Sequence, residues 1–170
     1  MPARSAGLLM FRRTSGRVEV LLAHPGGPFW ARKDAGAWSI PKGEVEGSES
    51  TESAALREFE QELGTRPEGK LLPLGEIVQK AGKRVTAFAI EGDLDTAAIA
   101  SNGFEIEWPP RSGKRQSFPE VDRAEWFTIA AAREKINPAQ AELLDRLEAK
   151  LKVGDAWRPA GASGGSTGLA

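Results

Sequence analysis

The segment from Gly43 to Thr65 limits the folds open to this chain more strongly than any other part of the sequence. Its apolar residues recur every four positions, at Ala55, Phe59 and Leu63. This spacing predicts an amphipathic helix over residues 51–63. Ser50 or Thr51 can cap the beginning of the helix, and Gly64 is placed to end it. We expect the apolar edge to face the protein core.

Short runs of strand-forming residues lie on both sides of this helix. Residues 5–11 and 18–23 are predicted to form a hairpin, because a Thr-Ser-Gly turn separates them. The other predicted elements are strands at 38–40, 71–79, 84–90, 104–108 and 123–127, a helical turn within 92–103, a loop at 109–119, and helices at 130–136 and 138–151. This order predicts an α/β (α+β) fold, in which a mixed central sheet lies between helices.

The composition excludes several classes of protein. The chain has 23 basic and 24 acidic residues and a net charge of -1, without the basic excess of a general nucleic-acid or membrane-surface binder. We therefore expect neither partner. The absence of cysteine excludes disulfides and thiolate zinc sites and fits a cytoplasmic location. The apolar run at residues 8–11 is too short for a signal peptide or a membrane span.

The 170 residues fit one domain of ordinary size. We predict this domain over residues 1–157 and a disordered tail over residues 158–170, which are mostly Gly, Ser, Ala and Thr. No DNA-binding domain is expected after the last predicted helix, which argues against a transcription regulator. The pattern does not decide the oligomeric state.

The predicted helix carries an oxygen-rich edge beside its apolar edge. Glu58 and Glu62 are four residues apart and therefore share one helical face, and Gln61 lies on the same side. Hard cations such as Mg²⁺ take oxygen ligands, which two carboxylates and one amide can supply. Such an ion would neutralise diphosphate charge and activate water. The alternative is a solvated acidic face, since ordinary helices often carry glutamates at this spacing.

The residues around this edge resemble the Nudix box. The box reads G-x5-E-x7-R-E-U-x-E-E-x-G-U, where U is a bulky aliphatic or similar residue. This chain has Gly43, Glu49 and the run R-E-F-E-Q-E-L-G from Arg57 to Gly64 at the same spacing. Two positions differ: Gln61 replaces the first of the paired glutamates, and Thr65 replaces a bulky apolar residue.

The resemblance in layout covers roughly residues 4–152, and it implies the Nudix fold with the box as a loop-helix-loop. It also implies hydrolysis of a phosphoanhydride bond in a nucleoside-diphosphate-linked substrate, with Mg²⁺ (or Mn²⁺) as cofactor. By position, the implied metal ligands are Glu58, Glu62, Gln61 and the carbonyl of Gly43. Arg57 and Glu49 are implied to pair and to brace the box.

The general base implied by the resemblance is either Glu58 or a glutamate of a later loop, for which Glu120 is our candidate. Lys42, directly before the box, is predicted to contact a phosphate, and Trp30 to stack on a base. The same contact with phosphate is predicted for the basic residues of the 109–119 loop, which are Arg111, Lys114 and Arg115. The alternative for these three is a solubilising role.

The substrate stays open between a nucleoside triphosphate and a dinucleoside polyphosphate. The chain lacks the proline after the box that marks the ADP-ribose type, and the run from Gly82 to Val85 is similar to animal dinucleoside tetraphosphate hydrolases. The neutral Gln61 supports an alternative function, a non-catalytic nucleotide-binding module. A third interpretation is a structural α/β domain with an accidental acidic helix.

Overall fold

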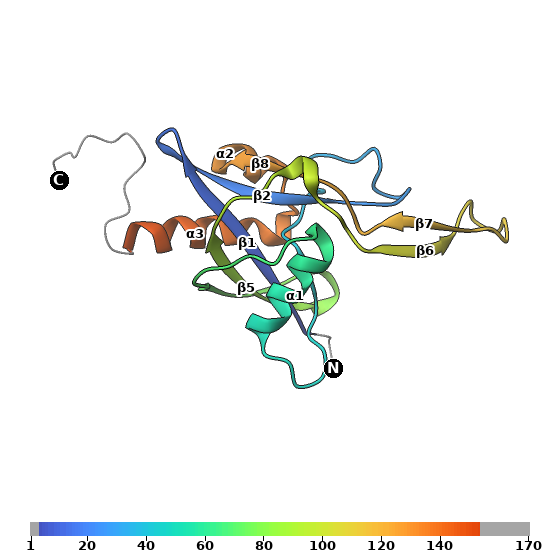
Figure 1. The fold of residues 1–170 in the computed structure, drawn as a ribbon, viewed down its shortest axis with the longest axis horizontal. Coiled ribbons are helices and arrows are strands. Elements are labelled where there is room, and N and C mark those ends of the chain that lie inside the picture. The colour runs from blue at the N-terminus through green and yellow to red at the C-terminus, as the bar shows by residue number, and fades with distance from the viewer. Residues whose placement is uncertain (1–3, 154–170) are drawn as a thin grey trace.

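A six-stranded mixed sheet lies at the centre of the molecule (Figure 1). The strands of this sheet are β1 (Arg4–Thr14), β2 (Arg17–Pro25), β3 (Lys42–Glu44), β4 (Leu72–Val78), β5 (Arg84–Glu91) and β8 (Val121–Thr128). Their order is β4-β5-β1-β2-β8, and β3 pairs with β1. β1 runs parallel to β5 and antiparallel to β2, so the prediction of a mixed sheet is confirmed. The computed structural model describes residues 4–153, and the predicted tail at 158–170 lies outside them.

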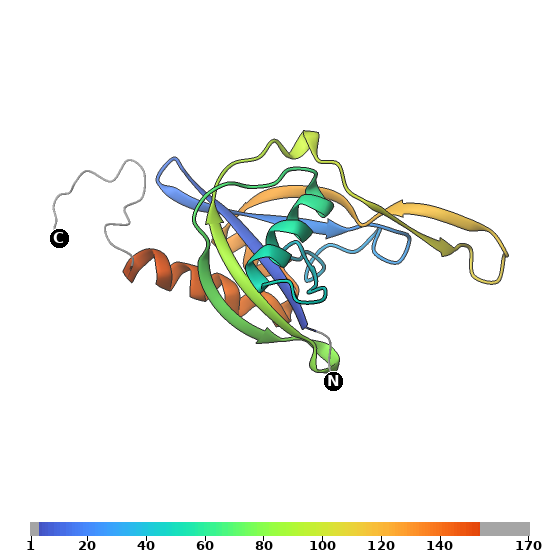
Figure 2. The ribbon, with the colours of Figure 1, turned by 60° about the horizontal axis from the view of Figure 1, so that its bottom comes forward.

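Three α-helices cover the two faces of this sheet (Figure 2). They are α1 (Thr51–Leu63), α2 (Ile129–Lys135) and α3 (Ala141–Val153). Successive side chains of β1 point to opposite faces of the sheet, which gives a core layer on each face. Leu8 packs in the core under α1, whereas Leu9 packs in the core under α3. β1 is therefore buried on both faces, which agrees with its nearly continuous apolar sequence.

The ends of α1 follow from local chemistry. The Ser50 side chain accepts a hydrogen bond from the backbone N–H of Ser53, as an N-cap does. Gly64 has a φ of 87°, a left-handed conformation that glycine adopts without strain, and its N–H donates to the Glu60 carbonyl. Both predicted helix ends are confirmed, and they fix the position of the acidic edge between them.

Two strands form an arm that extends away from the central sheet (Figures 1 and 2). They are β6 (Gly103–Glu107) and β7 (Arg115–Pro119), which pair antiparallel. The prediction of a loop over 109–119 is wrong for the residues of β7. Of these, only Phe118 is half-buried, so the strand is set by backbone pairing with β6 and not by an apolar pattern.

The other differences from the predicted elements are small. The strand expected at 38–40 is reduced to isolated bridges, from Ser39 to Ala23 and from Trp38 to Ile136, and the nearby strand is β3. Short 3-10 helices occur as η1 (Lys80–Gly82), η2 (Thr96–Ala98) and η3 (Pro138–Gln140). η2 is the helical turn expected within 92–103, and η3 with α3 replaces the single helix expected from Pro138.

Candidate active site

The contact between β3 and α1 places Gly43 against the Glu58 carboxylate. A Cβ atom added at Gly43 would overlap the carboxylate carbon and both carboxylate oxygens of Glu58. Only glycine fits here, because any side chain would displace Glu58 or push β3 away from the helix. The close approach puts the backbone of β3 beside the acidic edge of α1.

Arg57 ties the loop after β3 to α1. Its Nε and Nη2 donate to the two carboxylate oxygens of Glu49 at 2.8 and 3.0 Å, and Nη2 also donates to the Glu44 carbonyl at 2.9 Å. The guanidinium lowers the pKa of Glu49 to about 2, chiefly through these hydrogen bonds. The bidentate pair fixes the loop against the first turns of the helix.

The same guanidinium also contacts two residues of the acidic edge. Arg57 Nη1 donates to Glu58 Oε2 at 2.8 Å and to Gln61 Oε1 at 3.2 Å. These hydrogen bonds fix the orientation of the Glu58 carboxylate. The Gln61 oxygen points to the same side as Glu58, so the neutral residue of the box keeps its oxygen at this edge.

Glu62 and Glu120 add two further carboxylates to this region. Glu62 is half-buried, and loss of solvent, followed by the charges of Glu58 and Glu120, raises its pKa to about 8. The positive charge of Lys42 opposes this rise. The pKa of Glu120, in the link between β7 and β8, is also raised, first by burial and then by the Glu58 charge.

The donor set of these three carboxylates fits a hard cation. Their mutual repulsion is relieved either by a proton on Glu62 or by a divalent ion. Within residues 4–153, no three Asp, Glu or His side chains surround one point closely enough to hold an ion by themselves. Water and substrate oxygens would therefore complete the ligand shell, as they usually do for Mg²⁺.

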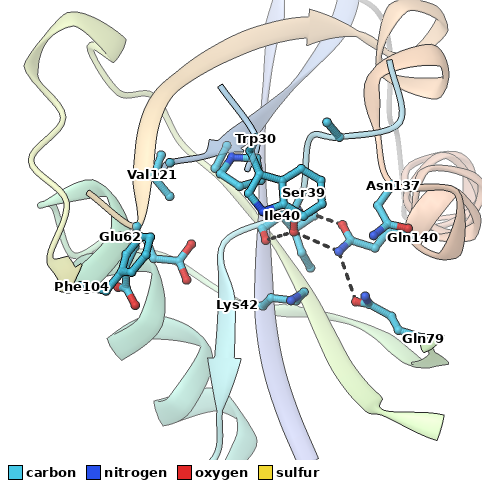
Figure 3. A pocket seen from close by; sticks show the side chains of 15 residues that line it. Trp30, Ser39, Ile40, Lys42, Glu62, Gln79, Phe104, Val121, Asn137 and Gln140 are labelled. Atoms are coloured by element: carbon cyan, nitrogen blue, oxygen red, sulfur yellow. Dashed lines mark hydrogen bonds between the residues drawn. The ribbon is translucent and has the colours of Figure 1, made fainter. Parts of the chain in front are cut away.

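A cavity of about 460 Å³ opens beside this acidic region (Figure 3). Glu62 and Glu120 form its acidic side, and Trp30 and Phe104 contribute aromatic rings to the lining. Figure 3 shows Lys42 between Glu62 and Gln79. The uncharged polar residues of the lining are Ser39, Gln79, Asn137 and Gln140. The volume suits one small-molecule ligand.

The comparison with protein families agrees with this arrangement. Residues 1–147 match the family model of the NUDIX domain. This chain belongs to the NUDIX family. The family predicted from the sequence is confirmed.

Solved NUDIX structures share the fold. A Caenorhabditis elegans Ap4A hydrolase in a binary complex matches with a TM-score of 0.59 and 22% identity, over 89% of this chain and 98% of that one. The NUDIX domain of Shewanella oneidensis NrtR, complexed with ADP ribose, matches with a TM-score of 0.62 and 15% identity, over 89% of each chain. A MutT protein from Methanosarcina mazei matches with a TM-score of 0.60 and 19% identity, over 89% and 96%. At these low sequence identities the structural similarity shows a shared fold and no more, and the predicted Nudix fold is confirmed.

One curated relative is larger than this chain. An octanoyltransferase from Myxococcus xanthus is 32% identical over 135 residues, which are 79% of this chain and 33% of that protein. The chain spans about a third of the length of this relative, so the match concerns one segment of it. Within residues 4–153, no helix is both long and apolar enough to cross a membrane.

The structure brings together only some of the nucleotide-binding residues predicted from the sequence. Lys42 and Trp30 line the cavity, whereas the basic residues of the arm do not. The latter are Arg111, Lys114 and Arg115. Arg111 and Lys114 lie in the turn of the β6–β7 arm, and Arg115 at the start of β7 makes an ion pair of 3.5 Å with Glu105 of the same arm. The geometry gives these three residues no contact with the cavity.

The sequence did not point to the polar wall of this NUDIX cavity. Gln79 and Gln140 are 61 residues apart and meet only after folding. Gln140 lies directly before the amphipathic helix α3, and nothing in the sequence around it predicts that a polar residue there is buried. In the structure its side chain is completely buried. Phe104 was expected only as a residue of a half-buried strand.

Proposed function

We propose that this NUDIX domain hydrolyses a phosphoanhydride bond in a nucleoside-diphosphate-linked substrate and depends on Mg²⁺ or Mn²⁺. The observation that carries the proposal is the meeting of three carboxylates from two separate segments beside a cavity with one lysine. These carboxylates are Glu58, Glu62 and Glu120, and burial together with the charges of Glu58 and Glu120 raises the pKa of Glu62. Such a cluster is costly without a cation and is suited to holding one.

Glu58 and Glu62 would hold the ion, with Gln61 and the Gly43 carbonyl beside them at the same edge. When bound, the ion would supply charge neutralisation for the phosphates and make a bound water more acidic. Arg57 orients Glu58 through the hydrogen bond of 2.8 Å. Glu49 and the Glu44 carbonyl hold Arg57 in turn, which makes the loop a brace for the acidic edge.

Glu120 is the better placed of the two candidate bases. A general base works best when its pKa lies near the working pH, and burial raises the pKa of Glu120. Glu120 also lines the cavity, whereas Glu58 does not line it and accepts a hydrogen bond from Arg57. In this mechanism Glu120 removes a proton from a water that attacks one phosphorus in line. The bond to the bridging oxygen breaks, and a phosphate-terminated group leaves.

The substrate class proposed is a nucleoside triphosphate or a dinucleoside polyphosphate. The names of the solved relatives point to different nucleotides, since one is an Ap4A hydrolase and another was complexed with ADP ribose. Trp30, which is 39% exposed, and Phe104 offer rings against which a base can stack. A cytoplasmic location remains the prediction made from the absence of cysteine.

The test is phosphate release from a panel of nucleotides with Mg²⁺, with Mn²⁺ and with a chelator. The panel holds nucleoside triphosphates, dinucleoside polyphosphates, ADP-ribose and nucleotide sugars, and an added phosphatase reveals products that keep their phosphate. We expect turnover that requires the metal and favours one class. The absence of turnover on every member would contradict the proposal.

The second candidate function is a nucleotide-binding module without catalysis. Gln61 favours it, because this side chain brings no negative charge to the acidic edge and its oxygen accepts a hydrogen bond from Arg57. Nucleotide binding without metal-dependent turnover on the same panel would support this function over hydrolysis.

A further inference from the structure

A completely buried glutamine organises one wall of the cavity. The Gln140 side chain makes three hydrogen bonds, which Figure 3 shows as dashed lines. Its Oε1 accepts from the backbone N–H of Ile40 at 2.9 Å. Its Nε2 donates to Ser39 Oγ at 2.9 Å and to Gln79 Oε1 at 3.2 Å. Every polar atom of this amide is therefore used.

The direction of this network follows from one backbone group. A backbone N–H can only donate, so the Gln140 atom that faces Ile40 must be the amide oxygen. The other end of the amide is then the nitrogen, which requires an acceptor on Gln79. The oxygen of Gln79 is thereby directed to Gln140. The atom of Gln79 left over is its nitrogen, which carries two N–H donors.

The Gln79 nitrogen has no hydrogen-bond acceptor among the described residues, and the half-buried side chain lines the cavity. Lys42 lines the cavity beside it, and among residues 4–153 its ammonium forms no ion pair (Figure 3). We call Gln79 and Lys42 the donor wall.

The donor wall favours a ligand group that accepts hydrogen bonds. A lysine offers three N–H groups and no lone pair, and the free end of Gln79 offers two N–H groups. The group that satisfies both is a phosphate, whose oxygens accept several hydrogen bonds and whose charge balances the lysine. A neutral base, which presents donors as well as acceptors, matches this wall less well.

We propose that Gln79 binds a phosphate group of the nucleotide alongside Lys42, and that Gln140 is a positioning residue that keeps the Gln79 nitrogen directed into the cavity. The inference rests on the proposed function in one respect, that a nucleotide occupies this cavity. It concerns binding and does not require hydrolysis.

The test compares ADP with adenosine by titration calorimetry in the presence of Mg²⁺, on the full chain. Gln79→Leu should weaken ADP binding by about tenfold or more, since a hydrogen bond to a charged group is lost. The same variant should leave adenosine binding unchanged, because adenosine has no phosphate. Gln79→Glu, which keeps the acceptor for Gln140 but brings an oxygen to the cavity, should weaken ADP binding further.

Gln140→Glu tests the positioning role. The new carboxylate still accepts from Ile40 but can no longer donate to Gln79, so the amide of Gln79 should turn its oxygen toward the cavity. We expect a loss of ADP affinity without a loss of adenosine affinity, and a lower melting temperature because the new carboxylate lies at a completely buried position. Gln116→Leu, which removes an exposed amide of the arm, is the matched control and should bind ADP like the wild type.

Several results would overturn the inference. The first is an unchanged ADP affinity in Gln79→Leu. The second is an equal loss of affinity for ADP and adenosine in that variant. The third is a wild-type protein that binds ADP and adenosine equally well. The melting temperature separates a folding defect from a binding defect. If Gln140→Glu unfolds, the variants of the half-buried Gln79 still test the inference. Phosphate-dependent binding without turnover on the nucleotide panel would contradict hydrolysis and leave the donor wall in place.

Discussion

Glu62 differs from an ordinary glutamate of a helix surface in its surroundings. Loss of solvent and the charges of Glu58 and Glu120 raise its pKa to about 8, so without a metal ion this carboxyl carries a proton at neutral pH. A cation that binds there must displace the proton. Because folding raises the pKa of Glu62 from 4.5 to about 8, this residue lowers the free energy of unfolding progressively as the pH rises from 4.5 to about 8, and the full cost remains above that range.

We expect Glu62→Gln to reduce turnover by about 100-fold or more, because even residues that only support a metal ligand commonly change activity by 10- to 100-fold. The melting temperature should stay the same or rise, since the substitution removes the cost of keeping this carboxyl protonated in the folded state. The measurements are kcat at saturating Mg²⁺ and thermal unfolding.

Glu60→Gln is the matched control for this change. Glu60 lies on the same helix, and its only ion pair within the described residues is a contact of 3.7 Å with Arg66. This variant should keep wild-type turnover. Full activity in Glu62→Gln, or an equal loss in both variants, would remove the assignment of the acidic edge as the metal site.

At the scale of elements, the pair of Arg57 and Glu49 joins a loop to a helix. The folded pKa of Glu49 is about 2, below its ordinary value of 4.5, so the ionised form stabilises the folded state. That contribution is present above pH 4.5 and is lost as the pH falls from 4.5 through 2. The loop and α1 should therefore separate more easily in acid.

We expect the wild type to exceed Glu49→Gln in free energy of unfolding at pH 7, and the difference to shrink to near zero by about pH 2. Urea unfolding at a series of pH values measures it. Glu68→Gln serves as control, because the exposed Glu68 forms no ion pair among residues 4–153. A difference between wild type and Glu49→Gln that does not change with pH would show that the pair contributes nothing.

The elements also show how far the sequence determines the structure. α1 was predicted with its ends because its cap residues and its apolar spacing are all local. β7 was not predicted because only one of its residues is half-buried, so its sequence shows no alternation of apolar and polar residues. Its strand conformation depends on pairing with β6. The acidic edge lies on one helix and was predictable. The hydrogen bond between Gln140 and Gln79 of the donor wall joins two distant segments, and no sequence spacing predicts it.

At the scale of the whole molecule, the sheet separates two cores with different relations to the site. The core under α1 contains Phe59, which lies between Glu58 and Glu62 in the sequence. The core under α3 contains Leu147, which is fully buried on the far side of the sheet. Stability is shared by the entire domain, but only the first core supports the acidic edge directly.

We expect Leu147→Ala to lower the free energy of unfolding by about 2–5 kcal/mol, as large-to-small substitutions in cores do. The Mg²⁺ concentration for half-maximal turnover should stay unchanged at temperatures where the variant is folded. Denaturant unfolding and a magnesium titration of activity measure the two effects. A large shift in the magnesium titration would show that the far core also controls the site.

The two sides of the cavity differ in how they are encoded along the chain. The acidic edge and its brace occupy one continuous stretch from Gly43 to Glu62, whereas Gln79 and Gln140 come from distant segments. Substitutions at Gln79 or Gln140 therefore leave the stretch with the acidic edge intact. In evolutionary terms, we expect the ligand preference of this domain to change independently of that edge.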